Sequence, residues 1–152
     1  MGLIFYIGFM ASGKSTLGEA EAARNGMRFV DLDQELWAFS GMPSWQYIKE
    51  KGEEAFRMAE RDCLHRIVER WHQDGTPPQI VACGGGTPCF FDNMEFIKTS
   101  GHVVFIDTPL STILERISLN PQRWPLAGNG NIEILYQSRK KWYEQAHERI
   151  VP

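Results

Sequence analysis

The stretch GFMASGKS, residues 8–15, decides the fold of this 152-residue chain. It matches the pattern G-x-x-x-x-G-K-[ST] at every fixed position, and the backbone N–H groups of such a loop surround a phosphate. The apolar run Leu3–Ile7 before it predicts a buried strand, and the residues from Lys14 to about Asn25 predict a helix after it. Because the pattern requires this strand–loop–helix setting, we expect ATP to bind here.

Outward from this loop, strands and helices alternate along the chain. Short apolar runs predict further strands at residues 27–30, 79–83 and 103–106. Helical spacing predicts helices at 44–51, 53–71, 111–118 and 132 to about 148, and another beginning soon after residue 33. This alternation is typical of a three-layer α/β/α fold with a mostly parallel central sheet, here one domain over residues 1–152. Ligands of such folds bind beyond the carboxyl ends of the strands.

Composition narrows the class of protein. The chain has 43% hydrophobic residues, 23% charged residues and a net charge of -3, which gives no sign of a nucleic-acid surface. Cys63, Cys83 and Cys89 have neither a disulfide framework nor metal-ligand spacing, so we expect reduced thiols. No apolar run approaches the about 18 residues of a membrane helix, and the N-terminal residues lack the basic segment of a signal peptide. We therefore expect a cytoplasmic protein with no membrane partner.

Two acidic residues follow the second predicted strand. Asp31 and Asp33 lie two residues apart, so on an extended strand end they would point the same way. One could hold Mg²⁺ through water, and the other could accept a proton from an acceptor hydroxyl. Seen alone, such a pair is more often a helix cap, but the phosphate loop upstream favours the catalytic interpretation.

Three glycines, Gly84, Gly85 and Gly86, follow the third predicted strand. They would let the backbone approach a ligand closely and offer N–H donors, although a flexible turn has the same composition. Arg57 on helix 53–71 has two interpretations. It could grip a carboxylate or phosphate of the acceptor, or form surface ion pairs with its acidic neighbours Glu53, Glu54 and Glu60.

The chain resembles the shikimate kinase family over nearly its whole length. Six sequence features, taken in order, support this resemblance. They are GFMASGKST at 8–16, FVDLD at 29–33, GMPSWQYIKEKGEEAFRMAE at 41–60, VACGGGT at 81–87, RWPLAG at 123–128, and Arg139. The phosphate loop alone would indicate only a P-loop kinase, whereas the Asp-x-Asp, Gly-Glu-x-x-Phe-Arg-x-x-Glu and Gly-Gly-Gly motifs in this order are far more specific. The resemblance implies a P-loop kinase fold like that of nucleoside monophosphate kinases. It also implies transfer of the ATP γ-phosphoryl group to the 3-hydroxyl of shikimate, in aromatic amino-acid biosynthesis.

The resemblance also implies roles for individual residues. The nucleotide would be bound by the phosphate-loop residues Gly8, Ala11, Ser12, Gly13, Lys14, Ser15 and Thr16. Lys14 would also be catalytic, and Mg²⁺ would be held by Ser15 and, through water, by Asp31. Asp33 would orient and deprotonate the acceptor hydroxyl. The acceptor would be held by the side chains of Arg57 and Arg139 and by the backbone of Gly84, Gly85 and Gly86.

The resemblance also implies roles for two segments of the chain and for two further arginines. Residues of about 34–60 would form a substrate-binding helical segment, and those of about 119–131 a lid whose closure expels water. The family's lid arginine commonly stands directly before Pro-Leu, where this chain has Trp124 and carries Arg123 one residue earlier. We expect Arg123 to be catalytic and to contact ATP, with Arg116 as an alternative phosphate partner. The protein would act as a monomer on a small molecule.

Two more departures and two alternatives remain. Ala11 stands where the family usually has glycine, and the sequence ends at Ile150-Val151-Pro152, just where the family forms its fifth strand and the following loop that helps enclose adenine. We therefore expect nucleotide affinity to be weak. A kinase of gluconate or of a nucleotide is the nearest alternative, although the motifs of those families are missing. A nucleotide-binding module that has lost turnover is the alternative from another class.

Overall fold

The computed structural model describes residues 2–121, 124 and 131–152. Its strands are β1 (Leu3–Ile7), β2 (Arg28–Asp31), β3 (Gln79–Ala82), β4 (His102–Ile106) and β5 (Glu148–Ile150). Its α-helices are α1 (Lys14–Arg24), α2 (Leu32–Ser40), α3 (Ser44–Lys51), α4 (Glu53–Gln73), α5 (Asn93–Ser100), α6 (Leu110–Leu119) and α7 (Ile132–Tyr143), and a short 3-10 helix, η1, covers Thr87–Cys89.

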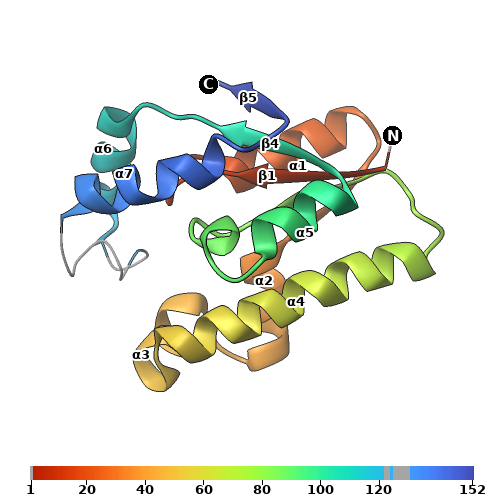
Figure 1. Ribbon diagram of the computed structural model, residues 1–152, viewed down its shortest axis with the longest axis horizontal. Coiled ribbons are helices and arrows are strands. Elements are labelled where there is room, and N and C mark those ends of the chain that lie inside the picture. Colours follow the sequence, from red (N-terminus) through yellow and green to blue (C-terminus); the bar gives the residue numbers. More distant parts are fainter. Residues whose placement is uncertain (1, 122–123, 125–130) are drawn as a thin grey trace.

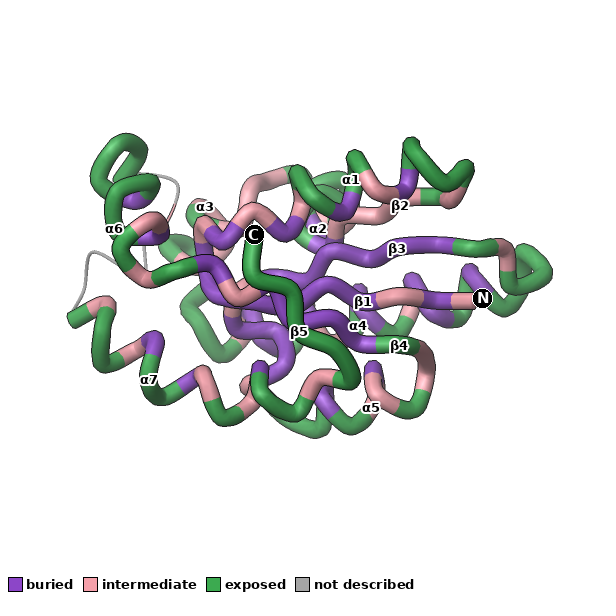
Figure 2. Tube along the Cα trace, turned by 90° about the horizontal axis from the view of Figure 1, so that it is seen from above, coloured by how far each residue is buried: buried purple, intermediate pink, exposed green. Residues whose placement is uncertain are grey.

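The strands form one sheet in the order β2-β3-β1-β4-β5, and every neighbouring pair is parallel. Helix α1 lies on one face of this sheet, while α5 and α7 lie on the other (Figures 1 and 2). The three-layer α/β/α architecture expected from the sequence is confirmed. Strands β1 and β4 lie side by side, although Ile4 and its partner His102 are 98 positions apart in the sequence. Loops from distant parts of the chain therefore meet at the edge of the sheet where the strands end.

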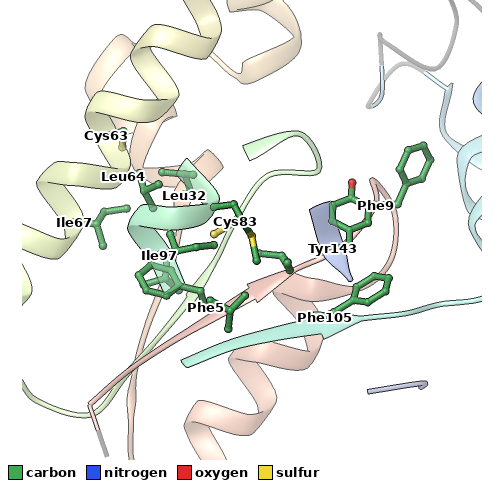
Figure 3. Packing of buried hydrophobic residues seen from close by; sticks show 14 of the residues in the cluster. Phe5, Phe9, Leu32, Cys63, Leu64, Ile67, Cys83, Ile97, Phe105 and Tyr143 are labelled. Atoms are coloured by element: carbon green, nitrogen blue, oxygen red, sulfur yellow. The ribbon is translucent and has the colours of Figure 1, made fainter. Parts of the chain in front are cut away.

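The two faces of the sheet bury different side chains, since successive residues of a strand alternate between faces. Phe5 and Ile7 of β1 belong to the larger core, together with Val81 and Phe105 of the flanking strands. Figure 3 shows Phe5, Phe105 and residues of α4 within this core. Tyr6 faces the other way, into a smaller cluster under α1. The sheet is therefore buried on both sides, as the continuous apolar run of β1 predicts.

The C-terminal part differs from the sequence-based expectation. The last helix was expected to reach about residue 148, but α7 ends at Tyr143 and residues 148–150 form β5 instead. His147 turns the chain toward the sheet, because its backbone N–H donates to the Val103 carbonyl and its ring nitrogen accepts from the Val103 N–H. The backbone N–H and C=O groups at the edge of β4 thereby pair with β5. If α7 continued to residue 148, these groups would have no backbone partner.

Two elements lie where no element was expected, η1 and α5. The side-chain amide of Asn93, at the start of α5, donates to the Thr87 carbonyl at 2.8 Å and so joins the two. Within the described residues, no helix combines the length and the hydropathy that a membrane crossing needs. All three cysteines are free thiols, as expected.

Candidate active site

The phosphate loop connects β1 to α1 and has an unusual backbone. Gly8 has a φ of 156°, and a Cβ atom there would lie 2.7 Å from the Ile106 carbonyl oxygen, so only glycine fits. Gly13 has a φ of 92° and Ala11 a φ of 61°. The left-handed conformation of Ala11 costs of the order of 1 kcal/mol, which agrees with a position where the family usually has glycine.

Lys14 lies in the first turn of α1 and is buried. Its ammonium group donates to the carbonyls of Gly8 and Phe9, each at 2.9 Å. Burial lowers the pKa of Lys14 to about 8, and the negative charge of Asp33 opposes this shift. The lysine therefore reaches back over the loop whose backbone the sequence pattern assigns to phosphate.

Ser15 and Asp31 form a contact between α1 and the end of β2. The serine hydroxyl donates to Oδ2 of Asp31 at 2.5 Å. The other carboxylate oxygen, Oδ1, caps helix α2 by accepting from the N–H groups of Asp33 at 2.9 Å and Gln34 at 3.2 Å. Asp31 thus uses one carboxylate oxygen to cap α2 and the other to accept the hydrogen bond from Ser15.

The structure corrects the expected geometry of Asp33. Asp33 does not extend the strand beside Asp31 but lies in the first turn of α2, because the chain turns into a helix directly after the capping residue. Asp33 is exposed to solvent and lines a pocket. Desolvation by the neighbouring protein atoms, with the charges of Glu60 and Asp31, raises the pKa of Asp33 to about 6, against the opposite influence of Lys14 and of the Ser44 hydroxyl.

Arg57 forms ion pairs with two of its acidic neighbours, but not on the surface. It pairs with Glu60 at 3.0 Å and with Glu53 at 3.3 Å along α4, yet it is buried rather than on the surface. Its guanidinium also lies over the ring of Phe90, 4.2 Å from the ring centroid. Ion pairs and stacking therefore hold the arginine in one orientation at the wall of the pocket.

The three glycines follow β3 and approach both charged residues of α4. A Cβ atom at Gly84 would lie 2.7 Å from Oε2 of Glu60, and one at Gly86 would lie 2.6 Å from Nη1 of Arg57. Among the described residues, the N–H groups of these three glycines donate to no backbone or side-chain acceptor. Their backbone donors are thus available to a ligand, as expected for a glycine loop at a strand end.

One pocket brings together all six acceptor residues that the sequence indicates. Asp33, Arg57, Arg139 and the stretch 84–86 line it. Sequence reasoning named none of the other lining residues as acceptor contacts, although five of them lie in the expected segment of about 34–60; they are Met10, Ser44, Trp45, Ile48, Phe56, Glu60 and Trp124. Glu60 was discoverable, because it lies one helical turn after Arg57 in α4.

The remaining predicted residues lie elsewhere. Arg116 of α6 is exposed and donates to the Ala11 carbonyl at 2.9 Å, so it lies against the phosphate loop. Thr16 lies in the first turn of α1 and is exposed. Arg123 lies outside the described residues, as does most of the expected lid.

Comparison with known proteins identifies the family of this chain. The shikimate kinase family model matches residues 10–152. The chain belongs to the shikimate kinase family. The shikimate kinase of Persephonella marina is 41% identical over 149 residues, which cover 97% of this chain and 87% of that protein. The resemblance seen in the sequence motifs is thus confirmed over nearly the whole chain.

Solved structures of shikimate kinases have the same fold. The Bacteroides thetaiotaomicron enzyme has a TM-score of 0.84 and 30% identity, with 99% of this chain and 86% of that chain covered. The Acinetobacter baumannii shikimate kinase, solved in complex with shikimate, has a TM-score of 0.82 and 28% identity, with 99% and 83% covered.

Proposed function

We propose that this chain transfers the γ-phosphoryl group of ATP to the 3-hydroxyl of shikimate. Family membership implies the use of ATP, and the relatives named above are shikimate kinases. One structural observation gives the strongest support for this proposal. A carboxylate, Asp33, shares a pocket with two buried arginines, Arg57 and Arg139. A small hydroxy acid needs such a pocket, with cations for its carboxylate and a base near its hydroxyl.

Each residue then has a defined part in the reaction. Arg57 and Arg139 bind the shikimate carboxylate, and the free N–H donors of residues 84–86 contact the acceptor and the transferred group. Asp33 takes the proton of the 3-hydroxyl as the new O–P bond forms and the bond to the ADP oxygen breaks. With a pKa of about 6, Asp33 is ionised at neutral pH and basic enough to accept this proton.

The phosphate loop binds the nucleotide in this proposal. Its backbone N–H groups surround the phosphates, together with the hydroxyl of Ser12, which is buried and has no partner among the described residues. Lys14 neutralises the charge that develops on the transferred group. Arg123 is proposed as a phosphate contact from its sequence position alone, and Arg116, which lies against the loop, is the alternative phosphate partner.

The residues present also fit Mg²⁺. No group of three His, Cys, Asp or Glu side chains within the described residues is placed for a metal ion, but Mg²⁺ usually binds one or two carboxylates together with substrate phosphates and water. The Ser15 hydroxyl and the Asp31 carboxylate, in contact at 2.5 Å, supply these protein oxygens. When bound, Mg²⁺ would neutralise negative charge on the β- and γ-phosphates.

The wider organisation is proposed on the same basis. Residues of about 34–60 act as the acceptor-binding segment, supported by Ser44, Trp45 and Ile48 in the pocket wall, and residues of about 119–131 act as the lid. The protein is proposed to act as a monomer. Three free thiols support a reducing compartment such as the cytoplasm.

Release of ADP from Mg-ATP tests the function. We expect release with shikimate and none with gluconate or AMP, each offered separately, and none with the Lys14→Ala variant. If ADP were released with gluconate or AMP but not with shikimate, that compound would be the acceptor in place of shikimate. Binding of ATP without release for any acceptor would instead support the module that has lost turnover.

Arg57→Ala tests the acceptor site separately from the nucleotide site. We expect it to weaken shikimate binding far more than ATP binding, because the arginine lies in the pocket and not at the phosphate loop. Arg61→Ala is the matched control, since Arg61 is on the same helix, is not among the pocket residues, and pairs with Asp62. Equal weakening of both ligands by Arg57→Ala would place the residue outside the acceptor site.

A further inference from the structure

Tyr143, the last residue of α7, is fully buried, and the proposed reaction assigns it no part. Its ring packs against Phe105 of β4, with the two centroids 5.3 Å apart (Figure 3). Its hydroxyl donates a hydrogen bond to the carbonyl oxygen of Gly85, the middle one of the three glycines that follow β3. A buried tyrosine hydroxyl needs one partner, and here that partner belongs to the site.

Besides Tyr143, Gly85 lies close to two other parts of the site. A Cβ atom on Gly85 would lie 3.0 Å from the backbone nitrogen of Met10 in the phosphate loop and 3.5 Å from Nη1 of Arg139. Arg139 and Tyr143 are separated by one helical turn of α7, so both lie on the face of this helix that is turned toward Gly85. The position of Gly85 is therefore coupled to that of the arginine proposed to bind the acceptor.

The orientation of the Gly85 carbonyl also fixes the orientation of the Gly86 N–H. The Gly85 carbonyl and the Gly86 N–H belong to one trans peptide unit and point in opposite directions. The carbonyl points toward Tyr143 in the core, so the N–H points away from it. Gly86 lines the pocket, is itself buried, and its N–H has no acceptor among the described residues. A buried donor without a partner at a pocket wall is suited to a ligand.

We infer that Tyr143 is a positioning residue of the acceptor site: by holding the Gly85 carbonyl, its hydroxyl directs the Gly86 N–H toward the acceptor or the transferred phosphoryl group. This inference rests on the proposed function for the identity of the ligand. The orientation of the peptide itself is a property of the protein without any ligand. A glycine peptide rotates easily, because glycine has no Cβ to restrict its dihedral angles, so the hydroxyl is needed to keep one orientation.

Tyr143→Phe tests this inference, because it removes the hydroxyl and keeps the ring. We expect kcat/KM for shikimate to fall about tenfold, as for one lost hydrogen bond to a buried acceptor, with KM for ATP within about twofold of the unchanged protein. Tyr6→Phe is the matched control, since Tyr6 is a buried tyrosine of β1 whose side chain is in the cluster under α1. It should leave both constants unchanged. A Tyr143→Phe protein with unchanged kcat/KM for shikimate, or with equal losses for both substrates, would overturn the inference.

A second measurement needs no turnover. In protein labelled with ¹⁵N-glycine, Tyr143→Phe should shift the amide resonances of Gly85 and Gly86 without ligand and leave that of Gly26 in place. Shikimate added to the unchanged protein should shift Gly86. Unmoved Gly85 and Gly86 resonances in the ligand-free variant would refute the positioning role whether or not shikimate is the substrate. If the unchanged protein neither binds nor phosphorylates shikimate, the proposed function fails, and the ligand-free resonances still decide the role of Tyr143.

Discussion

Arg57 and Glu60 form a buried ion pair in the wall of the acceptor pocket, with Nη1 of the arginine 3.0 Å from Oε1 of the glutamate. Their side chains are only 4% and 1% exposed. The second oxygen of Glu60 accepts from the Thr87 hydroxyl at 2.7 Å, so η1 also holds the carboxylate. The guanidinium is thereby oriented before any acceptor binds, which reduces the entropy lost on binding.

Glu60→Gln should destabilise the protein, because it leaves the buried Arg57 without its inner counter-charge. We expect the free energy of unfolding, measured with urea, to fall by about 3 kcal/mol. Glu53→Gln is the matched control: Glu53 pairs with the same arginine but its side chain is 45% exposed, so we expect less than about 1 kcal/mol. Equal losses in the two variants would contradict a special role for the inner pair.

Asp33→Asn should reduce kcat by about 100-fold or more, as for the loss of a positioned base. ATP binding, measured by calorimetry, should remain nearly unchanged, since Asp33 lines the acceptor pocket. Asp62→Asn changes an exposed carboxylate on α4 in the same way and should have no effect on either quantity. Turnover that survives in the Asp33 variant would remove this residue from the mechanism.

Gly86→Ala should impair the acceptor site without straining the backbone. Gly86 has a φ of -98°, which alanine adopts readily, but the new Cβ would lie 2.6 Å from Nη1 of Arg57. We expect the arginine to move, and kcat/KM for shikimate to fall about 100-fold, as for a misplaced binding group. Combined with Arg57→Ala, the same change should cost little more, since the clash is then gone. Additive losses would show that Gly86 acts independently of Arg57.

The three thiols should react slowly in the folded protein. Burial raises the pKa of Cys63 and of Cys89 to about 11, and that of Cys83 further still. The thiolate is the reactive form, so alkylation of Cys63 and Cys89 by iodoacetamide at pH 8 should be about 100-fold slower than in urea, given two pKa units. Mass spectrometry of labelled peptides would measure this, and fast labelling of Cys83 would contradict its burial.

The same shifts predict how the thiols affect stability at alkaline pH. Because the folded-state pKa values are raised, the stabilisation from the neutral thiols is fully present below the unfolded value near 9. It is lost as the pH rises from about 9 toward 11, since the unfolded chain then releases protons that the folded chain retains. Cys63→Ala should therefore lose less stability than the unchanged protein between pH 8 and pH 10.5, measured by thermal unfolding.

Much of the fold could be predicted because its signals are local. The fixed positions of the phosphate loop and the apolar run of β1 occupy neighbouring residues, and the helical spacing in α4 follows from its own sequence. The strand β5 was missed for the opposite reason. Residues 148–150 have no strong strand pattern of their own, and what makes them a strand is the free edge of β4.

By itself, the sequence determined the phosphate loop, the order of most strands and helices, and the residue types of the candidate site, because each depends on short-range patterns. Only the tertiary structure decided how these residues meet. It placed Asp33 on a helix rather than a strand end, made Arg57 a buried pocket residue rather than a surface one, and connected Tyr143 to Gly85 across 58 positions of sequence. These relationships depend on packing between distant segments, and local patterns do not encode which groups that packing buries together.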